Sequence, residues 1–266
     1  MNLNLQDQHV LVTGGSKGIG WACALGFLQE GARVSLVSRS AAGLQQGMDR
    51  LHTALPQAAG RVACFSADLT DANQAGGALD RAEAGFGPVD VLVNSAGAAK
   101  RTPPDELTPQ AWHDAMQAKY FSYIYMMDPA VKRMALRGRG VIVNVIGAGG
   151  RVASPIHMPG GAANAALMLA TAGMANAYAG KGVRVNAVNP GLTLTDRLKE
   201  GMSADARLQG ISAEEAMRRA TARLPRGRIA EPEEIANAVV FLASPRASYI
   251  TGAVLPMDGA LVPMGM

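Results

Sequence analysis

Apolar residues follow two alternating patterns along the chain. Seven short runs rich in β-branched residues are apolar nearly throughout, and the longer segments between them carry apolar residues three or four positions apart. Strands that are apolar on both faces, separated by helices, indicate a parallel sheet covered on both sides. The predicted strands are residues 9–14, 33–38, 61–67, 90–96, 140–146, 184–190 and 253–258, and the clearest predicted helices are 19–31, 41–55, 110–136 and 231–244.

The composition agrees with one large α/β domain over residues 1–266. The chain is 48% hydrophobic and 17% charged, which suits a well-buried globular protein. Its formal charge of +4 is spread out, and the one clustered basic run is 217–228, on a predicted helix and the loop after it. No basic platform with interleaved aromatic residues accompanies that run. We therefore expect a solvated surface or a phosphate-contacting lid there, and no nucleic-acid partner.

The sequence predicts a cytoplasmic protein without a membrane partner. Its first ten residues lack the basic and apolar regions of a signal peptide, and no apolar run approaches the roughly 20 residues needed to span a bilayer. Cys23 and Cys64 lie in apolar segments. We expect both to be free thiols in a reducing compartment.

The first predicted strand runs directly into TGGSKGIG, residues 13–20, and then into a helix. Gly14, Gly18 and Gly20 permit a tight turn, a close approach of ligand to backbone, and tight packing of helix on strand. The start of the helix offers free N–H groups and the positive end of its dipole to a phosphate. An ordinary glycine-rich turn is the alternative. The position between first strand and first helix favours a dinucleotide pyrophosphate.

The end of the second predicted strand bears on the choice of cofactor. A carboxylate at this point binds the ribose 2′-hydroxyl in NAD-binding proteins, whereas this chain has Ser38 followed by Arg39. Lys17 in the glycine loop adds a second cation, and arginine suits a 2′-phosphate. Each cation alone is common as a surface charge. At a strand end that lacks an acidic residue, the two cations together predict that NADP(H) is the cofactor, with NAD(H) less favoured.

Four further motifs follow in the order typical of one family. They are a residue pair after the third strand, an NSAG motif, an NPG motif with two threonines after it, and a C-terminal unit ending in DGA. Together with TGGSKGIG they resemble the short-chain dehydrogenase/reductase family along nearly the whole chain. The segments are Asp68-Leu69, 94–97, 189–191 with Thr193 and Thr195, and 228–260.

The resemblance implies a Rossmann-like, doubly wound sheet of seven parallel strands with helices on both faces. It also implies hydride transfer between a nicotinamide and a carbonyl or alcohol of a small molecule, no metal, and a homo-oligomer, either tetramer or dimer. A substrate-covering segment is expected around 196–227, which carries no readable specificity signal. The residues it assigns to the cofactor are Gly14, Ser16, Lys17, Gly18, Ile19, Gly20, Ser38, Arg39, Asp68, Leu69, Asn94, Ala96, Gly97, Pro190, Gly191, Thr193 and Thr195.

The positions that carry catalysis in this family hold other residues here. The family uses a tyrosine as proton donor, a lysine four residues later that lowers its pKa, a serine thirteen residues earlier, and an asparagine on an earlier helix. The register of NVIGAGG and ANAALM places the serine, tyrosine and lysine roles at Gly147, Gly160 and Asn164. The asparagine position is Lys119. All four family residues are absent, so the resemblance does not carry over to the catalytic step.

Two residues are candidates to replace the missing groups. The ammonium of Lys119 is expected either to occupy the space that the family's lysine would fill or to donate directly to a substrate oxygen. Asn164 or Asn144 would orient groups nearby. The alternative is a lysine that extends outward to solvent. His157 lies just before the tyrosine position, and its ordinary pKa suits proton transfer near neutrality. A histidine in a loop is also commonly a structural residue.

Small residues dominate the segment 160–180 that follows the tyrosine position. Close packing against a sister subunit is one interpretation. Another is that Gly160 and Gly161 open space beside the nicotinamide for a larger substrate. The aromatic residues of the neighbouring helices are interpreted as packing or interface residues: Tyr120, Tyr123, Tyr125 and Tyr178.

Three functions remain open at this point. The first is an NADP(H)-dependent oxidoreductase with a non-standard proton donor and an unknown small-molecule substrate. The second is a catalytically silent NADP(H)-binding sensor or partner protein, and the third is non-redox chemistry on the same scaffold. The intact glycine loop weighs against the third, because family members that abandon redox chemistry often lose that loop.

Overall fold

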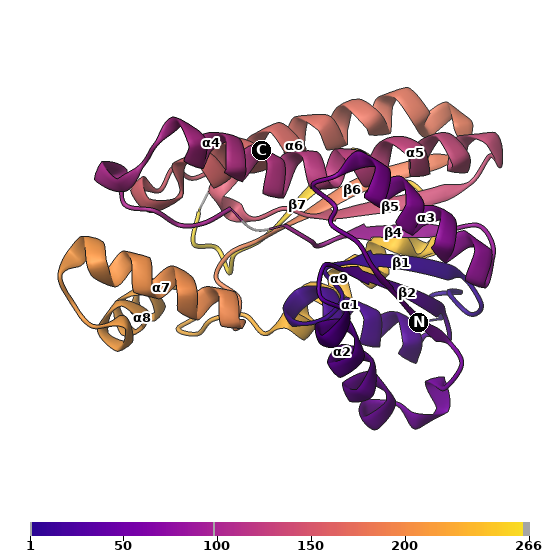
Figure 1. The fold of residues 1–266 in the computed structure, drawn as a ribbon, viewed down its shortest axis with the longest axis horizontal. Helices are drawn as coiled ribbons and strands as arrows, with labels where there is room; N and C mark the ends of the chain where they lie inside the picture. The colour runs from indigo at the N-terminus through magenta and orange to yellow at the C-terminus, as the bar shows by residue number, and fades with distance from the viewer. Residues whose placement is uncertain (1, 98, 263–266) are drawn as a thin grey trace.

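The computed structural model describes residues 2–97 and 99–262, and a parallel sheet forms its centre (Figure 1). The seven strands pair in the order β3-β2-β1-β4-β5-β6-β7, and every pairing is parallel. Each predicted strand is confirmed, as is the doubly wound α/β architecture. The strands are β1 His9–Thr13, β2 Arg33–Ser38, β3 Val62–Ser66, β4 Val91–Asn94, β5 Gly140–Val145, β6 Val183–Pro190 and β7 Val254–Met257.

Helices cover both faces of this sheet, and each face has its own apolar core (Figure 1). One core joins the sheet to α1, α2 and α9; the other joins it to α3, α5 and α6. The central strands are buried on both faces, which explains why they are apolar throughout. None of the helices in the described residues is long and apolar enough to cross a bilayer. The bounds are α1 Gly18–Gln29, α2 Ala41–Ala54, α3 Ala72–Phe86, α5 Ser122–Leu136, α6 Met158–Tyr178 and α9 Pro232–Ala243.

The segment expected to cover the substrate forms two helices, α7 Asp196–Gln209 and α8 Ala213–Ala222. They project beyond the carboxyl ends of the strands, set apart from the layered body (Figure 1). A small apolar cluster holds them together, with Leu198, Met202, Leu224 and Ile229 at its centre. These helices therefore form a separate wall on the side of the sheet where ligands of such folds bind.

The predicted helix 110–136 is continuous along the chain but changes its type in the middle. It consists of α4 Pro109–Ala115, a π-helical stretch Met116–Phe121, and α5. A π-helical turn holds more residues per turn than an α-helix and is common at functional sites. Lys119 lies within this stretch.

Candidate active site

The glycine loop packs tightly against the loop that follows β4. Gly14 has a φ of +67°, and a Cβ built on it would lie 2.9 Å from Ala96 Cα. Thr13 Oγ1 accepts hydrogen bonds from the backbone N–H groups of Ser95 (3.0 Å) and Ala96 (3.1 Å). A side chain at Gly20 would collide with the carbonyl of Gly14. Two predicted cofactor segments, 13–20 and 94–97, thus meet at the carboxyl ends of β1 and β4, where the strand order reverses.

The start of α1 has the features that a pyrophosphate requires. Lys17 is the N-cap residue, and no side chain caps the first-turn N–H groups among the described residues. Gly18 has a φ of +58°, and Thr195 Cγ2 lies 3.3 Å from where its Cβ would be. Lys17 Nζ lies 3.8 Å from Asp196 Oδ2 in an exposed ion pair, which is weak enough for a phosphate to displace. This cradle of backbone donors and cation fits a dinucleotide phosphate.

The end of β2 carries cations and hydroxyl groups. Ser16 Oγ donates to Ser38 Oγ at 3.5 Å, and Arg39 follows with its side chain exposed. Arg50 on α2 donates from Nη2 to the carbonyl of Ser16 at 2.6 Å, and its guanidinium lies over the ring of Trp21. Arg50 is a cation of this region that the motifs did not reveal, because it lies outside every one of them.

Asp68 and Leu69, which the family resemblance assigns to the cofactor, follow the end of β3, beside the end of β2. Asp68 Oδ1 accepts from Thr70 N (3.0 Å) and Thr70 Oγ1 (2.8 Å), and these bonds hold the pKa of Asp68 below its usual value. Leu69 is buried. Ser66 Oγ donates to the carbonyl of Arg39 at 2.9 Å, so the two strand ends are tied together.

Asn94 and Gly97 occupy different surroundings within the NSAG motif. Asn94 Nδ2 donates to Asn144 Oδ1 at 3.0 Å, and Asn144 in turn donates to Thr171 Oγ1 at 3.0 Å, all in the core. Asn144 makes no hydrogen bond to Lys119 in the described residues, so it belongs to this core network. Gly97, with a φ of +91°, packs on the carbonyl of Ala118 in the π-helical stretch.

The segment after β6 connects the sheet to α7. Pro190 ends β6, and the N–H of Gly191 donates to Met257 O at 3.0 Å. Thr193 is buried and pairs with Ala230 as an isolated bridge. Thr195 caps α7, which places its side chain over Gly18. Of the predicted cofactor residues in this segment, Thr195 therefore lies beside the glycine loop.

Lys119 is buried, with 8% of its surface exposed. Its Nζ donates to Tyr123 Oη at 2.8 Å and to the carbonyl of Val145, the last residue of β5, at 3.0 Å. Burial, helped by the positive charge of Arg197, lowers the pKa of Lys119 to about 7. The outward-extending alternative is wrong, because the π-helical turn directs this side chain into the protein.

Tyr123 is the partner that the sequence interpretation missed. Its Oη donates to the same carbonyl of Val145 at 2.5 Å, and its ring lies 4.4 Å from Lys119 Nζ. Burial raises the pKa of Tyr123 far above its usual range. The spacing of four residues between Lys119 and Tyr123 was the available signal, since it places both side chains on one helix face.

His157 occupies the space where the family's tyrosine would begin. A Cβ at Gly160 would collide with the ring of His157, lying 2.7 Å from Nδ1, and would lie 2.8 Å from the Cβ of Ala99. A Cβ at Gly149 would lie 2.7 Å from His157 Cδ2. Gly161 faces the carbonyl of Gly149. The two adjacent glycines therefore do not open space for a larger substrate: a ring and a backbone carbonyl fill it.

His157 is uncharged near neutral pH. Burial, helped by the positive charges of Arg101, Arg197 and Lys119, lowers its pKa to about 4. Its Nδ1 is buried and has no hydrogen-bond partner in the described residues. An imidazole in this state can accept or donate a hydrogen bond, but it is a poor source of a proton.

Gly147 and Asn164 face each other across the site. Gly147 has a φ of +130°, which a serine would adopt only with strain, and its N–H donates to Asn189 Oδ1 at 3.1 Å. Asn164 Nδ2 donates to the carbonyl of Gly147 at 3.4 Å, while its Oδ1 is buried without a partner in the described residues. Asn164 thus lies beside the family's serine position and makes no hydrogen bond to Lys119 there.

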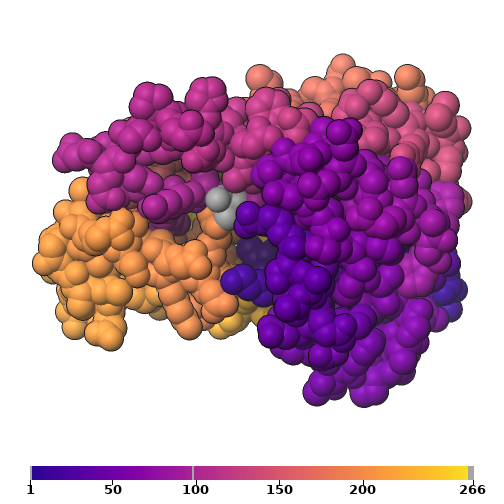
Figure 2. Space-filling model, viewed as in Figure 1, coloured from indigo at the N-terminus to yellow at the C-terminus, as the bar shows by residue number. Residues whose placement is uncertain are grey.

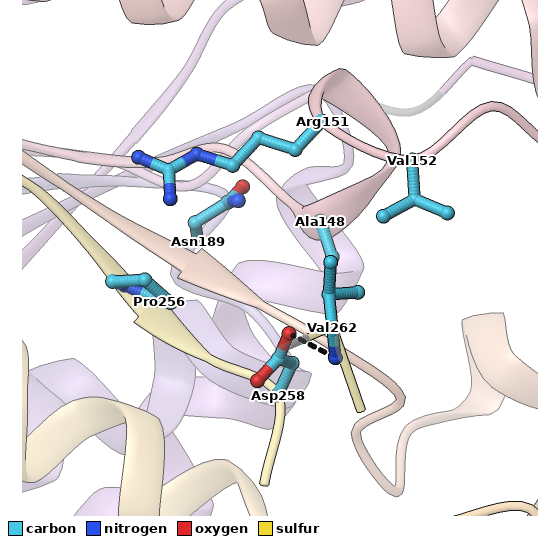
Figure 3. Close-up of a pocket in the computed structure, with 7 residues that line it drawn as sticks. All are labelled: Ala148, Arg151, Val152, Asn189, Pro256, Asp258 and Val262. Carbon is cyan, nitrogen blue, oxygen red and sulfur yellow. Dashed lines mark hydrogen bonds between the residues drawn. The ribbon is translucent and has the colours of Figure 1, made fainter. Parts of the chain in front are cut away.

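A pocket lies next to this loop, at the carboxyl ends of β6 and β7 (Figure 3). Ala148, Asn189 and Asp258 contribute to its wall, and Asp258 Oδ2 accepts a hydrogen bond from the N–H of Val262 at 3.3 Å. Asn189 connects the pocket to the site, because it holds the N–H of Gly147. Across residues 2–97 and 99–262, no group of three or more histidine, cysteine or acidic residues is arranged to hold a metal ion.

Comparisons with known proteins agree with the observed fold. The family described as enoyl-(acyl carrier protein) reductase matches residues 14–261. The chain is 36% identical, over 95% of its length and 96% of the relative, to a cis-4-hydroxycyclohexanecarboxylate dehydrogenase of Sinomonas cyclohexanicum.

Two solved structures have closely similar folds. One is L-sorbose reductase of Gluconobacter frateurii with NADPH and L-sorbose, at a TM-score of 0.90 and 27% identity, with both chains covered completely. The other is an NADPH-bound short-chain oxidoreductase of Pseudomonas aeruginosa PAO1 described as containing an atypical catalytic center. It has a TM-score of 0.86 and 30% identity, over 98% of this chain and all of the other.

Proposed function

Because the chain belongs to the short-chain dehydrogenase/reductase family, we propose that it is an NADP(H)-dependent oxidoreductase in which Lys119 transfers the proton. Its relatives are dehydrogenases and reductases of alcohols and ketones. The observation that carries the proposal is the buried ammonium of Lys119, bound to the carbonyl of Val145 at the end of β5, two residues before the family's serine position.

The preference for NADP(H) rests on the charges at the end of β2. Ser16, Ser38 and Arg39 lie at this strand end, and Ser38 stands where NAD-binding proteins have a carboxylate. Arg39 would hold a 2′-phosphate, with Lys17 as a second cation if its ion pair to Asp196 opens. Two of the solved relatives contain NADPH.

Lys119 has the properties of a general acid and base near neutral pH. With a pKa of about 7, it is protonated in part of the molecules and neutral in the rest, so it can give or take a proton. Two of its N–H groups are engaged by Tyr123 and Val145, which leaves one for a substrate oxygen. Tyr123 stays neutral and holds the ammonium in position.

The reaction balances with one hydride and one proton. When bound, the reduced nicotinamide supplies the hydride to the carbonyl carbon. Lys119 supplies the proton to the carbonyl oxygen, and the products are the alcohol and the oxidised nicotinamide. In the reverse direction neutral Lys119 takes the proton from the alcohol. His157 and Asn164 belong to the candidate site and offer hydrogen bonds, and His157 remains uncharged throughout.

A catalytically silent NADP(H)-binding protein is the second candidate. It is favoured by the closed state of the site, in which the ring of His157 fills the space beside Gly160 and the ammonium of Lys119 already has two acceptors. Such a protein would bind NADPH with the same residues and turn over no carbonyl compound. The two candidates therefore differ in turnover and agree in cofactor binding.

A screen of aldehydes, ketones and oxo acids, followed by the loss of NADPH absorbance, separates these candidates. We expect turnover in the wild type and a loss of at least about 100-fold in kcat for Lys119→Met. Lys199→Met, which removes an exposed lysine of α7, is the matched control and should retain full activity. Tight NADPH binding without any turnover would establish the silent protein instead. Activity that survives both Lys119→Met and His157→Ala would show that the proton comes from another group.

A further inference from the structure

Arg197 lies at the wall of the candidate site. It belongs to the first turn of α7 and donates from Nη2 to the carbonyl of Ala99 at 2.6 Å. The Cβ of Ala99 adjoins Gly160 at the place where a side chain would begin, together with the ring of His157. Arg197 is exposed over much of its surface, yet burial of its guanidinium lowers its pKa. The hydrogen bond places the guanidinium of Arg197 beside Ala99, whose Cβ adjoins Gly160.

Arg101 reaches the same region from the loop after β4. Its guanidinium crosses α7 at Gly201, where a Cβ would lie 2.9 Å from Arg101 Nη1 and 3.0 Å from Cζ. The N–H of Thr102 donates to Ile156 O at 3.0 Å, which ties this loop to the residues just before His157. Burial lowers the pKa of Arg101 as well.

The charge of these two arginines is not balanced by nearby acids. In the described residues no carboxylate oxygen lies within 4.0 Å of either guanidinium. Asp205 and Glu200 act on Arg101 and Arg197 only at longer range. Lys119 is a third cation whose field reaches His157. Partly buried cations that repel one another destabilise the protein unless an anion joins them.

The surface is hollowed in this part of the molecule. Figure 2 shows a recess between the orange residues of α7 and α8 and the magenta residues of the segment around α4. The candidate phosphate cradle at Gly18 and Lys17 contacts the two residues that precede Arg197, whereas the Arg197 guanidinium itself is hydrogen-bonded to the carbonyl of Ala99. The 2′-phosphate position lies at Arg39. The arginine pair therefore remains unassigned after the cofactor has been placed.

We propose that Arg101 and Arg197 bind an anionic group of the substrate, so that the protein acts on oxo acids and hydroxy acids or on their phosphate-bearing counterparts. The inference rests on the proposed oxidoreductase function. Two guanidinium groups can hold a carboxylate or a phosphate by paired hydrogen bonds. A substrate held this way would carry its carbonyl toward Lys119. The negative charge of the substrate would then contribute more to its selection than the shape of its carbon skeleton.

The test compares charged and uncharged members of matched pairs. Oxo acids of four to eight carbons are each paired with their methyl esters, and dihydroxyacetone phosphate is paired with dihydroxyacetone. Binding to the NADP⁺-saturated protein is measured by calorimetry, and turnover is measured with NADPH. We expect the best charged member to bind at least tenfold more tightly than its uncharged partner, and the advantage to shrink as salt rises. Comparing the pairs of oxo acids and esters with the phosphate pair identifies whether a carboxylate or a phosphate is recognised.

Variants assign the preference to the two arginines. Arg101→Met and Arg197→Met should each reduce the charged-over-uncharged ratio at least fivefold while NADPH affinity stays within twofold. Arg197→Lys should retain part of the charged-over-uncharged ratio, because lysine keeps the positive charge but lacks the paired N–H donors of the guanidinium. Lys100→Met and Lys199→Met remove exposed neighbouring cations and should leave the ratio unchanged. Melting temperatures verify that every variant is folded.

The outcomes separate this inference from the oxidoreductase function. Equal binding of acids and esters, no binding of any charged member, or a ratio that survives both methionine variants would overturn the arginine assignment. A loss of NADPH affinity in Arg197→Met would assign that arginine to the cofactor and overturn its role here. Binding of charged members without turnover would leave anion recognition standing and remove the oxidoreductase function.

Discussion

Replacing Lys119 by methionine should make the protein more stable and less active at the same time. The ammonium is buried, and its pKa falls from an ordinary value of 10.5 to about 7. At about 1.36 kcal/mol per pKa unit, the folded protein disfavours the protonated lysine by on the order of 5 kcal/mol relative to the unfolded chain. The methionine variant loses two hydrogen bonds, to Tyr123 and Val145, worth about 1 kcal/mol each. A net gain of about 3 kcal/mol follows at pH 6.

The stability gained in Lys119→Met should become smaller as the pH rises. Between about pH 7 and pH 10.5 the unfolded chain still binds a proton at Lys119 that the folded protein has released. The unfolded state binds more protons in this window, so the free energy of unfolding of the wild type rises with pH there. The methionine variant lacks this contribution. Its advantage is therefore fully present below pH 7 and shrinks by several kcal/mol toward pH 10.

Urea unfolding of both proteins at pH 6, 7.5 and 9 measures this difference directly. Comparing the two proteins at each pH cancels the contributions of the other titrating groups. Lys199→Met is the control, and we expect it to change stability by less than about 0.5 kcal/mol at every pH. A variant that is less stable than the wild type at pH 6, or a difference that is constant from pH 6 to 9, would refute the argument from burial.

Three other substitutions test the remaining contacts. Arg39→Ala should weaken NADPH binding at least tenfold and leave NADH binding nearly unchanged, measured by fluorescence titration; equal losses would contradict a 2′-phosphate contact. Gly160→Tyr should unfold or lose more than about 3 kcal/mol of stability, because the ring of His157 occupies that space, and a His157→Gly background should restore at least half of the loss. Tyr123→Phe removes an acceptor from the ammonium of Lys119 and should lower the pH at which reductive activity declines; an unchanged or higher pH would refute the positioning role.

The sequence predicts most of the fold because the signals for it are local. The apolar runs define all seven strands, and the glycine loop stands where the first strand meets the first helix. Each of these patterns spans only a few adjacent residues, so no knowledge of distant contacts is needed. The change to a π-helix at Met116–Phe121 has no such pattern, because six residues span less than two helical turns and are too few to distinguish a π-helical repeat from an α-helical one.

The candidate site is less predictable because its groups come together from distant segments. The orientation of Lys119 depends on the π-helical turn and on the carbonyl of Val145, 26 positions away. The ring of His157 is placed by two glycines, one of them in another loop. Arg101 packs on α7, which carries Arg197, and neither arginine lies in a motif. The homo-oligomer and the cytoplasmic location stay predictions.

The pH dependence of NADPH-driven reduction tests the central claim most directly. If Lys119 supplies the proton, kcat/KM for reduction is constant at low pH and falls tenfold per pH unit above about pH 7, and the reverse oxidation rises to a plateau near the same pH. Lys119→Met should remove this transition along with most of the activity. A profile that is flat from pH 6 to 9, or a transition that persists unchanged in Lys119→Met, would contradict the role assigned to Lys119.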